Sequence, residues 1–360
     1  MIQVYEHPDA SVLEDLNAFL ADPHGSPGRI ACPEHDPRWL SVLREALGHR
    51  PYLLVARSEG GPRDSIVGYL PLALVSSGLF GRFLVSLPYL NRAGVVASDP
   101  SVAAALVDRA ATLAEDLRAR YLELRHEQAI DHARLGATRN EKVRMVLQLP
   151  DGPEALFNAV GPKVRNQVRK AQKADLAIRW GGGDLVHDFY RVFAVNMRDL
   201  GTPVYPKRLF SRILAHFPGD AELAVVDAGG QPIAGALVLH HPGGAGGAPS
   251  SQVPSASCLR AWNHTNANMF MYHELLLRSM QRGSREFDFG RSSEGSGTYR
   301  FKKQWGAQPH PTVWQYHVIA GDMDAMRPDS ASNQRRVRMW KRLPVWTTRL
   351  VGPAIVRGIP

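Results

Sequence analysis

The stretch from residue 287 to residue 306 holds the densest group of side chains that could do chemistry, and it reads FDFGRSSEGSGTYRFKKQWG. We expect a strand that ends at Gly290, followed by a polar, glycine-rich loop whose backbone amides approach a ligand. The carboxyl ends of strands are where open α/β sheets build sites. Lys302 would supply a cation to a developing oxyanion or a donor phosphate, and Arg291 and Ser292 would contact the donor. The alternative is a structural loop with one packed tryptophan.

A strongly basic helix is expected over residues 162–174, PKVRNQVRKAQKA. It opens on a proline, which suits the first turn of a helix, and it carries five cations without one acid. Arg165 and Arg169 are four residues apart and therefore share a face. We expect this face to bind the phosphates of a donor or an RNA backbone. The alternative is a solvated helix whose charges only face water.

A second helix is expected over residues 185–200, and the Gly-Thr-Pro sequence that follows would end it. Arg198 and Asp199 in its last turn are candidates for a pocket lining, and Tyr205 would follow on a loop. An ion pair between Arg198 and Asp199 at a capped helix end explains the same residues without a site.

Missing motifs disfavour several enzyme classes. The chain has no GxGxxG after a strand, no GxxxxGK[ST] and no GxSxG, so dinucleotide binding, a P-loop and a serine hydrolase are disfavoured. The Arg/Gln-x-x-Gly-x-Gly/Ala run that opens a helix in ordinary acetyltransferases is also missing. His240, His241 and His264 have no carboxylate or thiolate at ligand spacing, so we expect no metal site. Cys32 and Cys258 are expected to be free thiols in a reducing compartment.

An internal repeat predicts the elements that position these residues. A strand, a glycine-rich turn and a second strand occur twice, with IVGYL starting at Ile66 and IAGAL starting at Ile233, 167 residues apart. A helix that leads into a short strand also occurs twice, at 102–118 and 268–282. The two strands start at Tyr121 and Phe287, 166 residues apart. Because two kinds of element share one period, a tandem duplication is favoured over a chance match of apolar strings.

Each repeat reads as helix, strand hairpin, strand, helix and strand, which predicts an α/β (α+β) fold with a mixed central sheet. A chain of 360 residues is comfortable for two such domains. We place the N-terminal domain at residues 1–153 as the acceptor side, the catalytic C-terminal domain at 154–322, and a basic tail that contains tryptophan at 323–360. We expect this tail to be an appendage.

The composition is that of a folded soluble protein, with 44% hydrophobic and 21% charged residues. No window holds the roughly 18 apolar residues of a membrane span, and the N-terminus lacks the features of a signal peptide, so we expect a cytoplasmic protein. The formal net charge of +9 points to an anionic partner such as nucleotide phosphates, tRNA, a lipid-linked sugar diphosphate or the inner membrane leaflet. A solvated surface encoded by a GC-rich genome gives the same excess of arginine.

The tail mixes cations with tryptophan in the segment 334–349, QRRVRMWKRLPVWTTR. This combination suits the interface of an anionic membrane, so the protein is expected to contact the inner membrane peripherally. A disordered basic tail is the alternative.

Taken together, these segments resemble the Fem-like (FemAB-related) branch of the acetyltransferase (GNAT) superfamily, especially the type associated with exosortase (PEP-CTERM) exopolysaccharide loci. The resemblance covers most of the chain, and the motif at 287–306 is its most specific part. The other matching segments are KVRNQVRKAQK at 163–173, MRDLGTPVYPKRLF at 197–210, NMFMYHE at 268–274 and LPYLNRAGVVAS at 87–98. It implies a tandem pair of GNAT-like domains that transfer an acyl or aminoacyl group to an amine.

The resemblance also implies a role for Phe301 and Lys302. They match a Phe-Lys pair whose lysine steadies the transition state in relatives that build peptidoglycan cross-bridges from aminoacyl-tRNA. Such relatives often carry a long helical arm for tRNA, and none is visible between residues 154 and 320. The pyrophosphate signature for coenzyme A is missing as well, so the donor stays open between acyl-CoA, with acetyl-CoA as the first choice, and aminoacyl-tRNA.

The expected reaction is attack by the neutral amine of a cell-envelope or exopolysaccharide sugar, free or lipid-linked, on an activated acyl carbonyl. Asp288 or Asp199 would interact with the attacking amine. Acceptor contacts are assigned to Tyr89, Asn91, Arg92, Arg198, Tyr205, Tyr299 and Phe301. Two alternatives remain, a tRNA-dependent transferase acting on a peptidoglycan precursor and a non-catalytic binding module in polysaccharide assembly.

Overall fold

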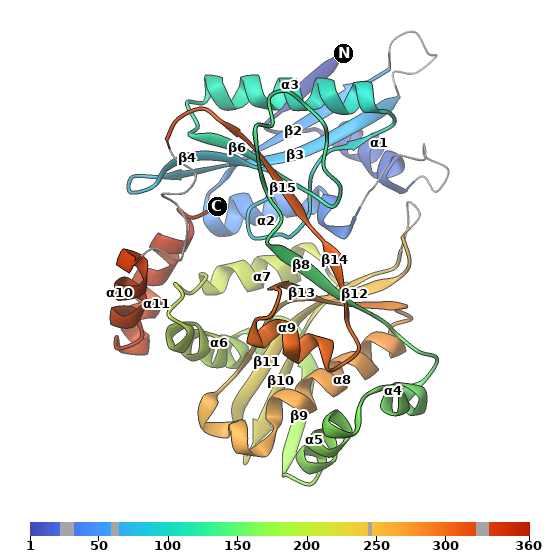
Figure 1. Cartoon of the computed structure of the whole chain (residues 1–360), viewed down its shortest axis with the longest axis vertical. Coiled ribbons are helices and arrows are strands. Elements are labelled where there is room, and N and C mark those ends of the chain that lie inside the picture. The colour runs from blue at the N-terminus through green and yellow to red at the C-terminus, as the bar shows by residue number, and fades with distance from the viewer. Residues whose placement is uncertain (22–31, 59–64, 244–246, 322–330) are drawn as a thin grey trace.

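The computed structural model describes residues 1–21, 32–58, 65–243, 247–321 and 331–360, and it contains two mixed β-sheets with helices on both faces of each (Figure 1). The first sheet has the order β1-β2-β3-β4-β6-β15-β7, and β5 pairs with β3. Its strands are β1 (Ile2–Tyr5), β2 (Arg50–Arg57), β3 (Ile66–Ser77), β4 (Gly81–Val85), β5 (Val96–Ala97), β6 (Tyr121–His126), β7 (Ala137–Arg139) and β15 (Val313–Val318).

The second sheet has the order β14-β8-β13-β12-β11-β10-β9. Its strands are β8 (Lys142–Gln148), β9 (Leu176–Gly181), β10 (Ala221–Ala228), β11 (Gln231–His241), β12 (Ser250–Cys258), β13 (Glu286–Ser293) and β14 (Gln308–Pro311). Each sheet contains one parallel pair, β4 with β6 and β12 with β13, and its other pairs are antiparallel. The mixed sheets confirm the predicted fold class, and the parallel pairs occupy corresponding places in the two repeats.

The helices are α1 (Ala10–Ala21), α2 (Arg38–Leu47), α3 (Pro100–Asp116), α4 (Pro153–Ala159), α5 (Pro162–Gln172), α6 (Val186–Leu200), α7 (Lys207–His216), α8 (Ala267–Gln281), α9 (Gly297–Lys303), α10 (Ala331–Trp340) and α11 (Val345–Val356). The predicted helices at 102–118 and 268–282 correspond to α3 and α8, each of which leads into a parallel strand. Asp99 starts α3 because its carboxylate accepts hydrogen bonds from the amides of Ser101 and Val102.

Alternating side chains of the strands separate the hydrophobic interior into layers. In β2, Leu54 faces α3, while Leu53 faces α1 and α2. In β10, Val226 faces α5 and α8, while Val225 belongs to the cluster that contains α6 and α7. The cluster with Val225 also contains Leu53, so one continuous apolar layer joins the two sheets.

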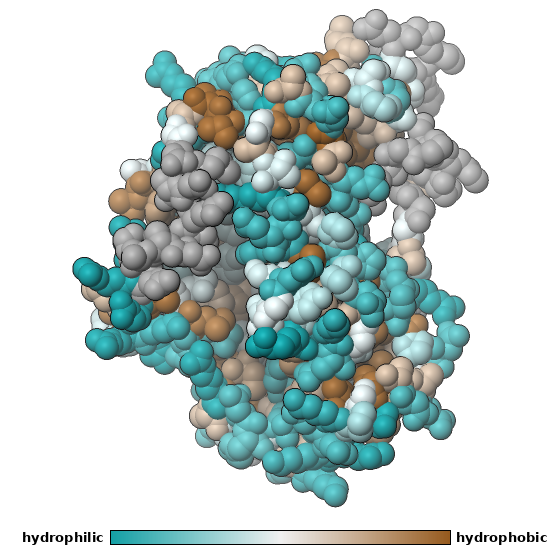
Figure 2. Space-filling view, viewed as in Figure 1, coloured by the Kyte–Doolittle hydropathy of each residue, from teal (hydrophilic) through white to brown (hydrophobic). Residues whose placement is uncertain are grey.

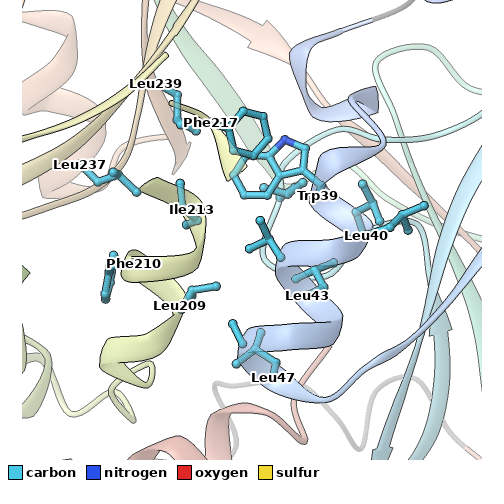
Figure 3. Close-up of a cluster of buried hydrophobic side chains, with 14 of the residues drawn as sticks. Trp39, Leu40, Leu43, Leu47, Leu209, Phe210, Ile213, Phe217, Leu237 and Leu239 are labelled. Carbon is cyan, nitrogen blue, oxygen red and sulfur yellow. The ribbon is translucent and has the colours of Figure 1, made fainter. Parts of the chain in front are cut away.

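Helices α2 and α7 meet in this shared layer (Figure 3). Trp39 of α2 packs against Phe217, which directly follows α7, with ring centroids 4.7 Å apart. Leu43 and Ile213 are buried beside them. Because burying a large apolar side chain contributes about 1.5–3 kcal/mol, this layer fixes one domain against the other.

Two strands lie in the sheet on the other side of the predicted boundaries. Strand β8 precedes residue 153 but pairs with β13 and β14 of the second sheet. Strand β15 precedes residue 322 but pairs with β6 and β7 of the first sheet. The repeat landmarks did not include either strand, since β8 and β15 connect the domains. The boundary between 322 and 323 itself lies outside the described residues, and the division into domains stays a prediction.

The C-terminal chain, expected to be an appendage, packs on both domains instead. Gly352 of α11 lies so close to the loop before α7 that a Cβ there would be 2.9 Å from the backbone N of Val204. Gly358 approaches the side chain of Ser77 at the end of β3 in the same way. Among the described residues, no helix is both long and apolar enough to cross a bilayer.

Candidate functional site

The parallel strands β12 and β13 part after only three paired positions, and the candidate site lies at this opening. Their register runs from Ser250 with Glu286 to Gln252 with Asp288 and then stops. Strand β13 bulges between Asp288 and Arg291 against β8, and Gly290 in the bulge has a φ of 77°. Glycine adopts this left-handed conformation without the steric cost that other residues carry. The bulge turns two backbone carbonyls of β13 out of the regular ladder.

Lys302 is the cation that holds these carbonyls. Its Nζ donates to the carbonyl oxygen of Gly290 at 3.0 Å and to that of Arg291 at 2.9 Å, and the side chain is only 8% exposed. Burial lowers the pKa of Lys302 to about 8, and nearby Asp288 opposes this shift. A third N–H remains, for which no acceptor is found among the described residues.

The segment before Lys302 is not the glycine-rich loop that we predicted. Strand β13 continues to Ser293, and α9 begins at Gly297. The hydroxyl of Ser296 accepts a hydrogen bond from the amide of Tyr299 and caps the helix. The short helix is what points Lys302 back at β13.

The other predicted residues of this segment differ in their surroundings. Phe301 packs edge-on against Tyr272 with ring centroids 4.9 Å apart, and Tyr299 is half-buried at the margin of the same apolar cluster. Ser292 is buried, and no hydrogen-bond partner of its Oγ is found in the described part of the chain. Roles for Tyr299 and Phe301 toward an acceptor, and for Ser292 toward a donor, stay predictions.

A chain of alternating charges connects the opening to the N-terminal domain. Arg144 of β8 lies between Asp288, at 3.2 Å, and Glu127, at 3.0 Å. Arg92 pairs with the same Glu127 and, at 3.2 Å, with Glu34. Four of these five side chains are at most 11% exposed, and Glu127 is 26% exposed. These ion pairs therefore connect the second sheet to the first across an interface that is largely buried from solvent.

Glu34 and Asp288, the two buried acids in this series of charges, have opposite pKa shifts. Burial alone would raise the pKa of Glu34, but Arg92 and Arg144 outweigh it, and its pKa lies below the usual value. Burial dominates for Asp288, whose pKa is raised in spite of Arg144 and Arg92. Asp288 also accepts a hydrogen bond from the amide of Gly290 at 2.7 Å. A carboxylate whose pKa is raised is a better proton acceptor than an ordinary one.

Arg291 reaches across the same interface as a cation without a carboxylate partner among the described residues. Its guanidinium lies 3.6 Å from the centre of the Trp314 ring, and its Nε donates to Oδ1 of Asn91 at 2.9 Å. Arg125 stacks on Trp314 at 3.9 Å but is paired with Glu123 at 2.6 Å. Burial and the nearby charge of Arg125 lower the pKa of Arg291 to about 9. An anionic ligand would compensate the buried positive charge of Arg291.

The predicted acceptor residues of the N-terminal domain lie on a strained loop next to this cluster. Tyr89 has a φ of 71°, which a tyrosine rarely adopts without a constraint from its surroundings. Its ring meets that of Tyr205 edge-on at 5.4 Å, so the structure brings these two predicted residues together from different domains. Its hydroxyl donates to the carbonyl oxygen of Val356 at 2.9 Å and lies 3.2 Å from Nε2 of His49.

Arg198 and Asp199 contact each other and the chain around them. Nε of Arg198 donates to Asp199 at 2.6 Å, and Nη1 donates to the carbonyl oxygen of Leu343 at 3.1 Å. Arg260 donates to the backbone carbonyl of Asp199 at 3.3 Å. This is the ion pair at a helix end that the sequence offered as its alternative, and Gly201 ends α6 in the left-handed conformation. A catalytic or binding role for either residue stays a prediction.

Arg165 and Arg169 of the basic helix contact the preceding helix. Nη1 of Arg165 donates to the carbonyl oxygen of Val160 at 2.6 Å, and the Arg169 guanidinium lies 5.1 Å from the ring centre of Phe157. Val164 and Val168 are buried, so a neighbouring side of α5 packs against α8. The structure explains the two arginines by local packing, and their binding of a donor stays a prediction.

Sequence reasoning missed Glu34, Glu127, Arg144 and Trp314, which hold the predicted residues together. Arg144 and Trp314 lie on β8 and β15, the two strands that pair with the sheet of the other domain. Their positions at the site therefore depend on strand pairings that the repeat did not predict. One signal was available. The strand YLELRH at 121–126 places Glu123 and Arg125 in an otherwise apolar strand, which indicates a buried ion pair.

No group of three or more His, Cys, Asp or Glu side chains that could hold a metal occurs among the described residues. Cys32 and Cys258 are both free.

Two surface cavities of about 430 Å³ each lie away from the Lys302 cluster. One is lined by residues around Pro150 and Arg285, and the other by residues around Tyr190 and Trp346. The charges and hydrogen bonds of the interface define the candidate site.

Comparison with protein families matches the segment that contains Lys302 to a known class of enzyme domain. Residues 162–303, which include β12, β13 and Lys302, match the acetyltransferase (GNAT) domain. The C-terminal part of the chain is thus a GNAT acetyltransferase domain, and the protein is an acyltransferase. Among curated proteins, no sequence matches the chain.

Solved structures extend the likeness over both domains. The structure of FemX is 12% identical with a TM-score of 0.61, covering 94% of this chain and 100% of that one. A tandem GNAT protein from the clavulanic acid biosynthesis pathway is 14% identical with a TM-score of 0.55, covering 89% and 100%. Saccharomyces cerevisiae N-myristoyltransferase with bound myristoyl-CoA is 10% identical with a TM-score of 0.51, covering 93% and 87%. At these identities the likeness shows the fold, a tandem pair of GNAT-like domains.

Proposed function

We propose that this protein is an N-acyltransferase that transfers an acetyl or similar acyl group to an amino group of a cell-envelope or exopolysaccharide sugar precursor. The observation that carries the proposal is the buried Lys302 ammonium at the opening between β12 and β13. A GNAT domain supplies the reaction class. The facing domain contributes Tyr89, Asn91 and Arg92 to the same interface.

Transfer to an amine needs three things from the protein. It must align the amine and the acyl carbonyl, remove a proton from nitrogen, and stabilise the negative charge that forms on the carbonyl oxygen. The remaining N–H of Lys302 is assigned to that oxygen, and Asp288 to the proton of the amine. The new bond joins nitrogen to the acyl carbon, and the bond from that carbon to the leaving sulfur or oxygen breaks.

The donor is proposed to be acyl-CoA, with acetyl-CoA as the first choice. Two cations at the end of β13, Arg291 on the strand and Lys302 bonded to its carbonyls, suit a donor that carries negative charge. A donor of this kind supplies an activated carbonyl when bound. Ser292, whose buried hydroxyl has no partner among the described residues, is a further proposed contact.

The acceptor is proposed to be an amino sugar, free or lipid-linked, in the cytoplasm and at the inner membrane surface. Aromatic and amide side chains suit a saccharide because rings stack on its apolar face and amides bond its hydroxyls. Tyr89, Tyr205 and Asn91 provide such groups at the domain interface. A place in an exosortase (PEP-CTERM) exopolysaccharide system is part of the proposal and rests on the sequence resemblance.

A second candidate is a transferase that takes its acyl group from aminoacyl-tRNA and acts on a peptidoglycan precursor. The fold similarity to FemX, which extends over 94% of this chain, favours it. Loss of activity on treatment with ribonuclease would select this candidate, and a strict requirement for acetyl-CoA would select acyl-CoA. A pair of domains that binds a sugar nucleotide without turning over any donor would be a binding module.

The test is mass spectrometry of the surface polysaccharide from cells with the gene, without it, and with a Lys302→Ala copy. We expect one acyl mass on an amino sugar to disappear in the deletion strain and in the Lys302→Ala strain, and to return with the wild-type gene. An unchanged polysaccharide and peptidoglycan in the deletion strain would refute the proposal. Loss of a peptidoglycan cross-bridge residue instead would select the second candidate.

A further inference from the structure

Exposed hydrophobic side chains gather at the C-terminal helices. Nine large hydrophobic residues are exposed in the described part of the chain, and five of them belong to the last 22 residues. These five are Met339, Trp346, Leu350, Val351 and Ile359. Trp346 and Leu350 are 70% and 73% exposed. Single exposed hydrophobic residues are ordinary on soluble proteins, but a concentration of this kind marks an interaction surface.

Most of the net charge of the protein lies in the same helices. Residues 331–360 contain seven Lys and Arg residues and no Asp or Glu, whereas the whole chain has a formal net charge of +9. All seven cations are exposed. They are Arg335, Arg336, Arg338, Lys341, Arg342, Arg349 and Arg357. In Figure 2, hydrophilic and hydrophobic side chains lie next to each other at the left edge, over α10 and α11.

Helix α11 presents this mixture outward because its other face is fixed to the body of the protein. Thr348, Gly352 and Val356 are buried, and they recur every four residues along one face. On the opposite side, Trp346 and Leu350 are exposed. The helix therefore keeps small residues against the protein and turns its largest hydrophobic residues to solvent, the reverse of an ordinary surface helix.

A cavity of about 430 Å³ opens on this face between α11 and the start of α7. It is lined by Tyr190, Pro206, Lys207, Trp346, Arg349, Leu350 and Pro353. Two cations thus stand beside an apolar wall, and the Arg349 guanidinium lies 5.4 Å from the ring centre of Tyr190. A phosphate ester that carries an aliphatic chain matches both halves of this lining.

We propose that α10 and α11 form a surface that docks on an anionic lipid bilayer, with a lipid phosphate headgroup held between Lys207 and Arg349. Tryptophan and leucine enter the interface between headgroups and acyl chains, and the nearby cations are attracted to anionic lipid. A second copy of the chain does not suit this surface, since pairing would bring seven cations against seven. Nucleic acid would use the cations but leave Leu350 and Val351 in water.

The docking surface is linked to the candidate site through the backbone of α11. The carbonyl oxygen of Val356 accepts the hydrogen bond of the Tyr89 hydroxyl, and Tyr89 lies on the strained loop of the domain interface. A bilayer bound to α11 would therefore lie beside the acceptor side of the interface. That this placement serves a lipid-linked acceptor rests on the proposed function, whereas bilayer binding itself does not.

The test is sedimentation of the purified full-length chain with phosphatidylcholine vesicles that contain or lack phosphatidylglycerol. We expect binding to the anionic vesicles that weakens as salt is raised, and little binding to the neutral ones. The variant Trp346→Ala/Leu350→Ala and the variant Lys207→Gln/Arg349→Gln should each weaken binding by about tenfold or more. These side chains are exposed or line an open cavity, so unchanged thermal melting should show that the variants fold.

Arg285→Gln is the matched control, since Arg285 is exposed and lines the other cavity of about 430 Å³. It should bind anionic vesicles as the wild type does. Equal binding by all variants, or binding to RNA but not to vesicles, would overturn the proposal. So would a dimer that Trp346→Ala/Leu350→Ala dissociates in the absence of vesicle binding. Vesicle binding without any acyl transfer would refute the proposed function alone.

Discussion

At the scale of single residues, Lys302 is a cation kept where water is largely excluded. Taking an ammonium out of water is costly unless it is bonded, and two backbone carbonyls supply those bonds. The bonds leave one N–H for a ligand, and the lowered pKa records the cost that remains. A group arranged in this way before the substrate arrives needs no reorganisation during the reaction.

Replacing Lys302 by alanine should reduce the rate of acyl transfer by roughly a hundredfold, the usual scale for one group that stabilises an oxyanion. The fold should survive because the change removes a buried cation rather than an apolar contact. Steady-state kinetics and thermal melting of the purified variant check both parts. Turnover close to that of the wild type would show that the oxyanion is stabilised by other groups.

The pH dependence of the reaction should show the titration of Lys302. Below its pKa of about 8 the side chain is the cation that the mechanism uses, and as the pH rises through that value the charge and the activity are lost. The rate profile should therefore fall on its basic side near pH 8. In Lys302→Arg the residual activity should lack this fall, since arginine stays charged. If the rate of Lys302→Arg still fell near pH 8, the titrating group would be another residue.

Sequence was informative about Lys302 and uninformative about what surrounds it. The motif and the resemblance of Phe301 and Lys302 to a Phe-Lys pair predicted the role of Lys302, and that role stays a prediction. Its acceptors are backbone carbonyls of a bulge, and no residue type encodes a carbonyl. Arg291 was expected near a donor from its neighbours in the motif, but its stacking on Trp314 requires two strands that lie far apart in the sequence.

At the scale of elements, the chain of charges between β13 and the N-terminal domain determines how the two halves of the site face each other. Arg144 lies at its centre with bonds to Asp288 and Glu127. A buried ion pair adds little net stability over apolar packing, but removing one member leaves the other charge without compensation. Orientation rather than stability is therefore its main contribution.

Changing Arg144 to methionine should lower the free energy of unfolding by about 3–5 kcal/mol, the usual cost of breaking a buried pair. The change should also raise the pKa of Asp288 further, since Arg144 is the first group that opposes the effect of burial there. Urea denaturation measures the stability. A loss below about 1 kcal/mol would show that water reaches the interface, as it does in exposed pairs.

The repeat predicted most of the elements and missed those that join the domains. Hairpins and crossover helices have local signatures in apolar spacing and glycine turns, so α3, α8 and the hairpins β2-β3 and β10-β11 were found. Strands β8 and β15 each complete the sheet of the other domain, and their pairing depends on contacts distant in sequence. Helix α9 was not among the predicted elements, although the structure shows a serine cap at its start.

At the scale of the whole molecule, the shared apolar layer and the two exchanged strands tie the domains into one cooperative structure. Trp39 and Phe217 lie in that layer, and Trp305 is buried in the core of the second domain. Unfolding either domain alone would expose the layer between α2 and α7 and leave strand edges of the partner sheet without their neighbour.

Thermal unfolding should consequently be a single transition, with tryptophan fluorescence and circular dichroism changing together. Replacing Phe217 by alanine should lower the stability by about 3–5 kcal/mol and keep the single transition, since it opens a cavity in the shared layer. Two separate transitions in the wild type would mean that the domains are independent units.

The central claim, transfer of an acyl group to an amine at the interface beside Lys302, is tested most directly by mass spectrometry of a purified reaction. Glucosamine or a lipid-linked amino sugar would be incubated with acetyl-CoA and, in parallel, with aminoacyl-tRNA, using wild type and Lys302→Ala. We expect one acyl group on the amine with the wild type and acetyl-CoA, and roughly a hundredfold slower formation with the variant. No acylated amine with either donor, or equal rates for the two proteins, would contradict it.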